Sequence, residues 1–293
     1  MRKFAMGAAL LGALGLAVTG LSSAQADEGQ GLEKHRNVSS LDEVRGFPGK
    51  SDGKASTFGW TQGNTTFSSV VVNGNKNIAV GTTNAKTFSI VITVSDPDGI
   101  QEADAYIWRG TDPDNDVEQA FWNPDDFASC TPAGGTTVTC TQTITILPHD
   151  DVNAYLWNTL AGTWNVYAGI LDGNGEVVEN YFYKTTKVQR YAKATVNATP
   201  EPVSKGRTLT VYGKLTRASW DSFRYLGYSG QWVSLDYRRS GDAYVKIKGV
   251  KTNSSGDLKG YATAYADGYW RYYYKGNIPT SAATAAGDYV DVR

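Results

Sequence analysis

Acidic side chains recur at alternate positions in the segment T-D-P-D-N-D-V-E, which runs from Thr111 to Glu118. A calcium ion binds about six to eight oxygen atoms, usually from several carboxylates and backbone carbonyls. An extended loop with this spacing could present several carboxylates on one side. The segment is not an EF-hand, because that loop requires glycine at its sixth position and glutamate at its twelfth. Here those positions hold Val117 and Asn123.

Two interpretations of this acidic segment remain open. It is either an irregular calcium site or a polar turn, in which proline sets the bend and aspartate caps the backbone. Two other turns could contribute ligands to a calcium site, namely S-D-P-D-G at 95–99 and L-D-G-N-G at 171–175, the latter through Asp172 and Asn174. The candidate calcium ligands are Asp96, Asp98, Asp112, Asp114, Asp116 and Glu118.

Residues that could support catalysis are scarce. The chain has two histidines, His35 and His149, and no G-x-S-x-G elbow, nucleotide-binding glycine loop or zinc ligand set. Carboxylates do occur in close pairs, and a glycoside hydrolase needs two carboxyls across a cleft. These pairs lie in turn sequences, so we expect a protein that is not an enzyme. The pairs are Asp96 and Asp98, Asp125 and Asp126, and Asp150 and Asp151.

Cys130 and Cys140 are the only cysteines, and they flank T-P-A-G-G-T-T-V-T. In an oxidising compartment two cysteines this close, on either side of a Gly-Gly turn, should form a disulfide. No C-x-x-C spacing suggests a redox or metal site. We therefore predict a structural disulfide.

The N-terminal segment has the features of an export signal. Arg2 and Lys3 precede an apolar run, and Ala24-Gln25-Ala26 offers small residues for cleavage before Asp27. We predict that residues 1–26 are a signal peptide and that the protein is secreted and extracellular. No later segment has the roughly 20 apolar residues that cross a bilayer, so we expect no membrane insertion. Residues 27–60 are polar and glycine-rich, which predicts a disordered stalk.

The elements that must position these residues are strands. Phe88, Ile90, Ile92 and Val94 alternate with polar or smaller residues, the period of a half-buried strand. Similar runs recur along the chain, separated by turns such as D-P-D-G and D-G-N-G. We predict an all-β protein with two tandem immunoglobulin-like β-sandwich domains. Their predicted ranges are 61–190 and 191–293.

Charge divides the chain at the same position. Residues 61–190 carry 15 acidic and 6 basic residues, a net charge of −9, whereas residues 191–293 carry 8 acidic and 15 basic residues, a net charge of +7. We call these ranges the acidic block and the basic block. Such asymmetry influences partners and association rather than the fold. The blocks should either dock on each other or present separate binding faces, and we expect no nucleic-acid partner.

Several stretches of the basic block carry a family resemblance. They are G-K-L-T-R-A at 213–218, Y-S-G-Q-W-V-S-L-D-Y-R at 228–238, S-S-G-D-L-K at 254–259, D-G-Y-W-R-Y at 267–272 and A-G-D-Y-V-D-V at 286–292. They resemble the Ig-like module that closes many small secreted proteins of actinobacteria. In the acidic block, S-V-V-V-N-G-N-K-N-I-A-V-G at 69–81 and G-T-W-N-V-Y-A-G-I-L-D-G-N-G at 162–175 are similar to domains that accompany that module. The resemblance implies an Ig-like architecture, calcium binding in some relatives, and no catalytic residues.

Tyrosine is concentrated in the basic block, most densely in G-Y-W-R-Y-Y-Y-K-G at 268–276. On a strand, Trp270 would face the core together with the residues two and four positions later, and the alternate residues would face outward. The outward set could stack on sugars or bind an anionic wall polymer. Alternatively, it forms cross-strand pairs that only stabilise the sheet. The candidate ligand-binding residues are Tyr269, Arg271, Tyr273, Arg238 and Lys246.

Together these patterns predict a secreted, non-catalytic binding or structural protein that acts at or near the cell envelope. Its expected partner is an anionic cell-wall polymer or a carbohydrate. The main alternative is a calcium-binding structural or adhesive protein that uses the acidic loops of the first domain. Further alternatives are an inhibitor of a secreted hydrolase, which would present the hairpin between Cys130 and Cys140, and a carbohydrate-active enzyme.

Overall fold

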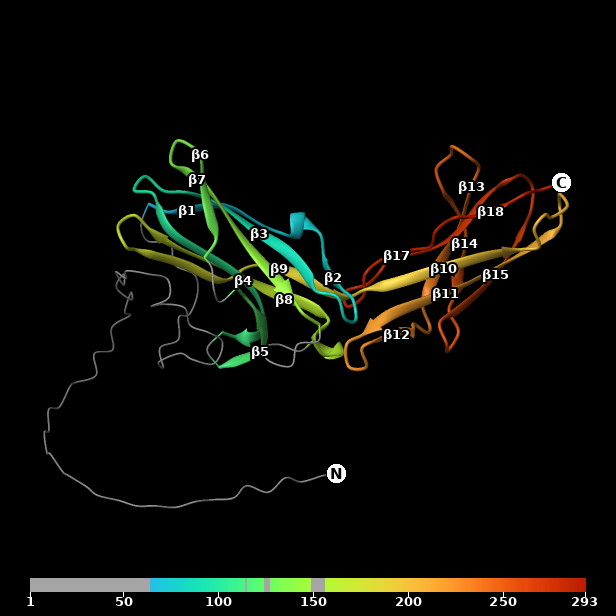
Figure 1. Ribbon diagram of the computed structural model, residues 1–293, viewed down its shortest axis with the longest axis horizontal. Coiled ribbons are helices and arrows are strands. Elements are labelled where there is room, and N and C mark those ends of the chain that lie inside the picture. The colour runs from blue at the N-terminus through green and yellow to red at the C-terminus, as the bar shows by residue number, and fades with distance from the viewer. Residues whose placement is uncertain (1–63, 114, 124–126, 149–155) are drawn as a thin grey trace, which may run out of the picture. The chain divides into compact units, whose positions relative to one another are not determined.

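The computed structural model describes residues 64–113, 115–123, 127–148 and 156–293 (Figure 1). The predicted signal peptide and stalk lie outside these residues. So do His35, Asp114, Asp125, Asp126, His149, Asp150 and Asp151. Within the described ranges the chain forms strands and two short 3-10 turns, and no helix there is long and apolar enough to cross a membrane.

The acidic block contains two sheets. One sheet has the antiparallel order β1-β3-β7-β6, formed by β1 (Thr66–Val72), β3 (Lys86–Ser95), β7 (Thr137–Ile146) and β6 (Ser129–Gly134). The other has the order β2-β9-β8-β4-β5, formed by β2 (Ile78–Val80), β9 (Val177–Arg190), β8 (Gly162–Asp172), β4 (Ile100–Asp112) and β5 (Asp116–Phe121). The 3-10 turns η2 (Asn73–Asn75) and η3 (Asn158–Leu160) connect strands of this block.

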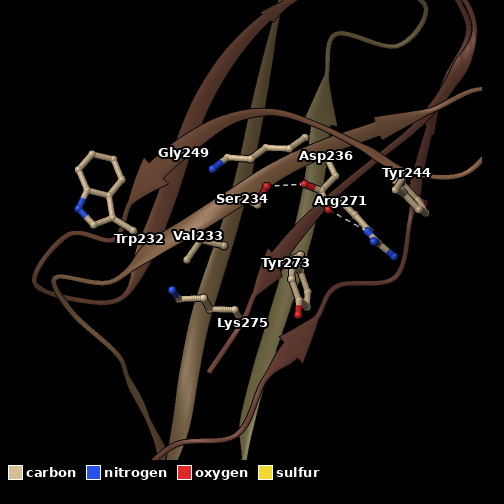
Figure 2. A pocket seen from close by; sticks show the side chains of 10 residues that line it. Trp232, Val233, Ser234, Asp236, Tyr244, Gly249, Arg271, Tyr273 and Lys275 are labelled. Atoms are coloured by element: carbon tan, nitrogen blue, oxygen red, sulfur yellow. Dashed lines mark hydrogen bonds and ion pairs between the residues drawn. The ribbon is translucent and has the colours of Figure 1, made fainter. Parts of the chain in front are cut away.

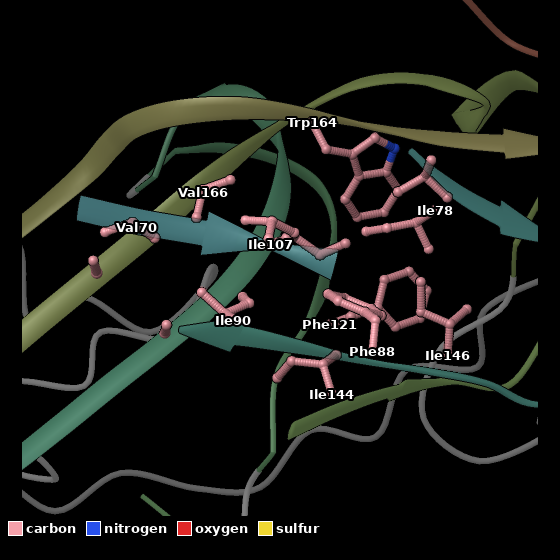
Figure 3. Packing of buried hydrophobic residues seen from close by; sticks show 14 of the residues in the cluster. Val70, Ile78, Phe88, Ile90, Ile107, Phe121, Ile144, Ile146, Trp164 and Val166 are labelled. Carbon is pink, nitrogen blue, oxygen red and sulfur yellow. The ribbon is translucent and has the colours of Figure 1, made fainter. Parts of the chain in front are cut away.

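The core of the acidic block lies between these sheets because the strands alternate. In β3 every second residue is buried, as the sequence predicted, and Ile90 and Ile92 are fully buried. Ile107 of β4 and Trp164 of β8 pack into the same cluster from the other sheet (Figure 3). The alternation therefore provides one apolar face per sheet, and the two faces bury each other.

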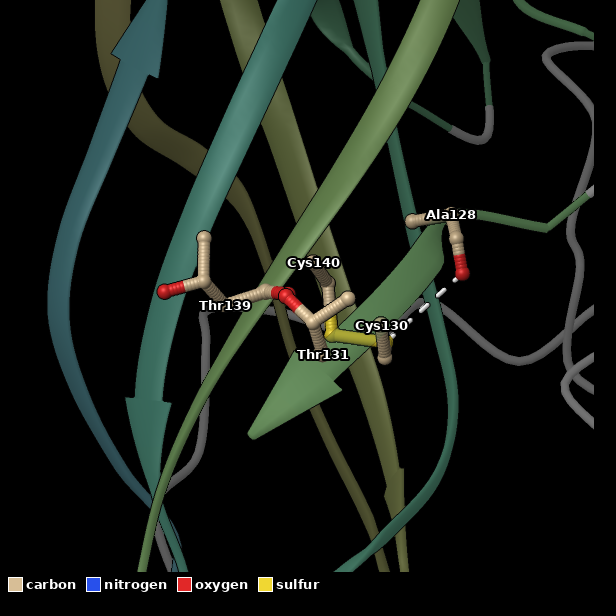
Figure 4. The surroundings of a disulfide bond; sticks show 5 residues. All are labelled: Ala128, Cys130, Thr131, Thr139 and Cys140. Atoms are coloured by element: carbon tan, nitrogen blue, oxygen red, sulfur yellow. Dashed lines mark hydrogen bonds between the residues drawn. A yellow bond between two sulfur atoms is a disulfide. The ribbon is translucent and has the colours of Figure 1, made fainter. Parts of the chain in front are cut away.

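The predicted disulfide is present. Cys130 on β6 and Cys140 on β7 are paired directly across the two strands, and their sulfurs are bonded (Figure 4). Cys140 is fully buried in the core of the acidic block, so the bond fastens the edge strand β6 to the sheet interior.

The basic block also contains two sheets. In one, β11 (Thr208–Ser219) pairs with β10 (Ala192–Thr199), β12 (Arg224–Gly227) and β15 (Asp257–Thr263). The other has the order β14-β13-β16-β17, with β18 also paired to β16. Its strands are β14 (Val245–Lys251), β13 (Trp232–Arg238), β16 (Gly268–Tyr274), β17 (Ala283–Thr284) and β18 (Asp288–Val290). A separate apolar cluster, which includes Leu215, Leu235 and Tyr272, fills this block.

The all-β prediction is confirmed, and the sheets form sandwich-like folds. Several strands were not predicted from the sequence, among them β10, whose sequence A-K-A-T-V-N-A-T carries a single large apolar residue. It becomes a strand because it pairs along its whole length with β11. Tertiary pairing here outweighs a weak local signal, as is common for strands.

The two blocks are joined by a packed junction. Trp220, which follows β11, is fully buried and belongs to the same apolar cluster as the core of the acidic block. Its indole Nε1 donates to the carbonyl of Gly81 at 2.9 Å, and its backbone N–H donates to Oδ1 of Asn158 at 3.0 Å. Arg190 Nε donates to the carbonyl of Ala218 at 2.5 Å. Burial, followed by the nearby charge of Arg217, lowers the pKa of Arg190 to about 10.

This junction is apolar and hydrogen-bonded rather than electrostatic. Among the residues that the structure describes, no ion pair joins the acidic block to the basic block.

Candidate functional site

A groove of about 590 Å³ lies on the outer face of the sheet β14-β13-β16, opposite the core of the basic block (Figure 2). Its walls combine aromatic rings, basic side chains and one carboxylate. It is lined by Trp232, Val233, Ser234, Asp236, Tyr244, Lys246, Gly249, Arg271, Tyr273 and Lys275.

Strand alternation on β13 builds the floor of this groove. Val233 and Leu235 point into the core and are buried, so Trp232, Ser234 and Asp236 face outward. The Trp232 side chain is 67% exposed, although it is the largest apolar group of the strand.

Gly249 makes room for the Trp232 ring. It lies opposite Ser234 on the neighbouring strand β14. A Cβ atom at Gly249 would come within 3.3 Å of the indole, a tighter contact than most side chains tolerate. The missing side chain therefore lets the ring lie over the backbone of β14.

Arg271 is held in position on two sides. It lies directly opposite Asp236 in the β13–β16 register, and its Nε donates to Asp236 Oδ2 at 3.3 Å. Asp236 is only 5% exposed and also accepts a hydrogen bond from Ser234 Oγ. On the other side, the guanidinium carbon of Arg271 lies 3.7 Å from the ring centroid of Tyr244. A buried carboxylate and an aromatic face thus restrain the orientation of the guanidinium.

The guanidinium keeps donors for a ligand. Within the described part of the chain, no hydrogen bond occupies Nη1 or Nη2 of Arg271. Lys246 and Lys275 are exposed and line the same groove. Three cations therefore face one buried carboxylate, and this carboxylate is already paired. The groove has the charge and the donors to bind an anion.

The predicted outward residues do face outward. Arg271 and Tyr273 line the groove, whereas Trp270, Tyr272 and Tyr274 are buried in the core. Tyr269 lies one step further along the strands, where Arg238 is stacked over its ring at 4.7 Å. The face of each residue on β16 was thus predicted correctly.

Seven of the ten residues that line the groove were missed from the sequence, and among them Trp232, Asp236 and Tyr244 shape the site most directly. The alternation in Q-W-V-S-L-D-Y places Trp232 and Asp236 opposite the apolar residues of β13, so that signal was present. Tyr244 precedes β14 in the connection from β13, and no periodic pattern indicates where its ring lies.

The described residues of the acidic segment at 111–118 lie at the end of β4 and the start of β5, and Asp114 lies outside the described residues. Asp112 Oδ1 accepts from the backbone N–H of Asn115 at 3.2 Å, and Asp116 Oδ2 accepts from that of Thr111 at 3.2 Å. Glu118 forms an ion pair with Arg109 at 2.7 Å. These contacts are those of a capped turn. In the described ranges, no three His, Cys, Asp or Glu side chains are grouped to hold a metal ion.

The other candidate ligands lie at the opposite end of β4. Asp96 accepts from the backbone N–H of Asp98 at 2.7 Å and from the Thr65 hydroxyl, and Asp172 accepts from the N–H of Asn174 at 2.9 Å. These two turns adjoin each other, since Gly173 N–H donates to the carbonyl of Gly99 at 2.8 Å.

The prediction that Asp96 and Asp98 could join the acidic segment at 111–118 was wrong. The 13-residue strand β4 separates the two groups, and it spans about 40 Å at about 3.3 Å per residue. Carboxylates at its two ends cannot share one ion.

Calcium is therefore expected to leave thermal stability unchanged. Asp96, Asp112 and Asp116 already accept backbone hydrogen bonds and Glu118 pairs with Arg109, so an ion would have to displace those contacts. The melting temperature in 2 mM calcium should match that in chelator. A shift of several degrees that Asp116→Asn abolishes would instead establish a site, because binding at 100 times Kd stabilises by about 2.7 kcal/mol.

Comparisons with known proteins find distant similarities to solved structures. No family model and no curated protein matches the chain. Among solved structures, the fibronectin(III)-like modules of Clostridium thermocellum CbhA match at 12% identity over 78% of this chain and 92% of that chain, with a TM-score of 0.31. The Yersinia pseudotuberculosis adhesin InvE matches at 14% identity over 78% and 59% of the two chains, with a TM-score of 0.26. Similarities at this level carry no argument about function.

Proposed function

We propose that this chain is an exported, non-catalytic binding protein that holds an anionic polymer of the cell envelope on its basic block. The observation that carries the proposal is the geometry of Arg271, which lines the groove, is restrained by Asp236 and Tyr244, and has no hydrogen bond on its Nη donors among the described residues. Export is supported by the signal-like N-terminal sequence and by the disulfide, since such bonds persist in oxidising compartments. A binding role is supported by the absence of catalytic motifs from the sequence.

Charge supports an anionic partner over a neutral one. The basic block carries a net charge of +7, and Lys246, Lys248 and Lys251 are exposed on the single strand β14. Like charges this close repel one another unless solvent or a counter-charge compensates them. A polyanion laid across β14 and the groove would supply that counter-charge. The acidic block would repel the same polymer, so binding should be confined to one part of the chain.

The test is co-sedimentation of the secreted protein, residues 27–293, with purified cell walls. Retention should be strong at low salt and should decrease steadily towards 1 M salt, because the Debye length falls from about 10 Å at 0.1 M to about 3 Å at 1 M. Lys246→Gln combined with Lys275→Gln should weaken retention at every salt concentration, because both removed cations line the groove.

The matched control is the pair Lys76→Gln and Lys187→Gln, which removes the same charge from exposed or half-exposed positions of the acidic block. This control should be retained like the unaltered protein. The proposal fails if walls do not retain the protein, if retention is independent of salt, or if both double variants behave alike.

A further inference from the structure

The outer face of β13 and β16 carries aromatic and basic groups in a repeating order. Trp232, Ser234, Asp236 and Arg238 all point outward from β13, with a rise of about 7 Å between successive members. Across the register, Tyr273 lies opposite Ser234, Arg271 opposite Asp236, and Tyr269 opposite Arg238. Along the strand the face therefore presents an indole, then a phenol, then two guanidinium groups.

Tyr244 connects the two guanidinium groups. Its ring centroid lies 3.7 Å from Cζ of Arg271 and 5.0 Å from Cζ of Arg238. Both arginines are thus held near one aromatic ring, one strand step apart. An arginine restrained in this way loses little side-chain entropy when it binds a planar or tetrahedral anion.

The aromatic end of the groove is not explained by sheet stability. Tyr269 has a cross-strand aromatic partner, since its ring lies 5.2 Å from that of Tyr289. In contrast, no ring stacks on Trp232 or Tyr273 among the described residues. Trp232 is 67% exposed and Tyr273 is 37% exposed. In the described part of the chain these two rings face the groove without an aromatic partner, and the Arg271 guanidinium lies 6.0 Å from the Tyr273 ring centroid.

We infer that the groove binds an anionic glycan, with sugar rings stacked on Trp232 and Tyr273 and acidic substituents paired with Arg271 in the groove and with Arg238 one strand step beyond it. This inference rests on the proposed function and specifies its ligand. A bare polyanion would use the arginines and lysines and gain nothing from an exposed indole. A sugar ring has an apolar C–H face that packs on an aromatic ring, and its substituents can place an anion within reach of a guanidinium.

In this arrangement Asp236 is a positioning residue. It holds Nε of Arg271, so the two Nη groups form the fork that a phosphate or carboxylate oxygen pair would meet. Arg271→Lys keeps the charge and removes the fork. Trp232→Ala removes a ring on which a sugar would stack, whereas Arg271→Lys removes the forked donor for the anion. These two variants therefore test the two contacts separately.

The experiment measures binding of the secreted protein to two probes: the acidic glycan polymer released from purified cell walls, and linear polyphosphate. Trp232→Ala should weaken binding to the wall glycan about tenfold, equivalent to about 1.4 kcal/mol, and change binding to polyphosphate less than twofold. Arg271→Lys should weaken binding to both probes. Tyr265→Ala, which removes a 69% exposed ring outside the groove, should change neither.

The binding results for the two probes distinguish a failure of the glycan inference from a failure of the proposed function. If Trp232→Ala leaves wall-glycan binding unchanged while Arg271→Lys weakens it, the groove binds a bare polyanion, and the inference fails although the proposed function stands. If the unaltered protein binds neither probe, the proposed function itself fails. Melting curves exclude misfolding as the cause, because the exposed Trp232 contributes little to the core and its variant should melt within about 2 °C of the unaltered protein.

Discussion

Trp220→Ala is expected to lower the free energy of unfolding by about 3–5 kcal/mol, the largest effect of any substitution considered for this chain. Trp220 is fully buried and packs in the core of the acidic block, although it belongs to the basic block. Truncation to alanine leaves a cavity nearly as large as an indole ring. It also removes the donor to the Gly81 carbonyl. That half-buried carbonyl then loses its partner, which adds to the cost.

Urea unfolding followed by circular dichroism measures this loss. Trp232→Ala is the matched control, because it removes the same side chain from an exposed position and should change stability by no more than about 0.5 kcal/mol. Since Trp220 joins the two blocks, its loss should also split one unfolding transition into two. A loss below about 1 kcal/mol with a single transition would show that the indole does not hold the junction.

Cys130→Ser is expected to lower the free energy of unfolding by about 2–3 kcal/mol. The disulfide closes a loop with a sequence separation of 10 residues and so restricts the unfolded chain. It also fastens β6, which lies at the edge of its sheet and is mostly exposed. Removing the bond therefore frees both the unfolded chain and a weakly packed edge strand.

Reduction of the unaltered protein supplies the control for this substitution. Reduced protein and Cys130→Ser should show the same loss, because both lack the bond and only one has a changed side chain. Native oxidised protein should show no free thiol on alkylation. Labelling of either cysteine under those conditions would contradict a stable disulfide, and a reduced protein as stable as the oxidised one would remove its structural role.

The sequence determined the fold class through strand periodicity. The alternation from Phe88 to Val94 predicted which residues of β3 are buried, because a strand turns successive side chains to opposite faces. The same rule placed Trp270 and Tyr272 in the core and Arg271 outside. The pairing of Cys130 with Cys140 followed from their closeness in the chain. Each of these features depends on neighbours within a few residues, which is why local patterns suffice.

The tertiary structure alone decided which distant residues meet. The register between β13 and β16 sets Arg271 opposite Asp236, and the β13–β14 connection brings Tyr244 over the guanidinium. A shift of one residue in that register would send each of these side chains to the other face, yet it would leave the sequence pattern unchanged. The tertiary structure also decided that Asp96 and Asp112 lie far apart, because the whole 13-residue strand β4 runs between them. Strand pairing joins residues far apart in the chain, and periodicity along one strand carries no information about its partner.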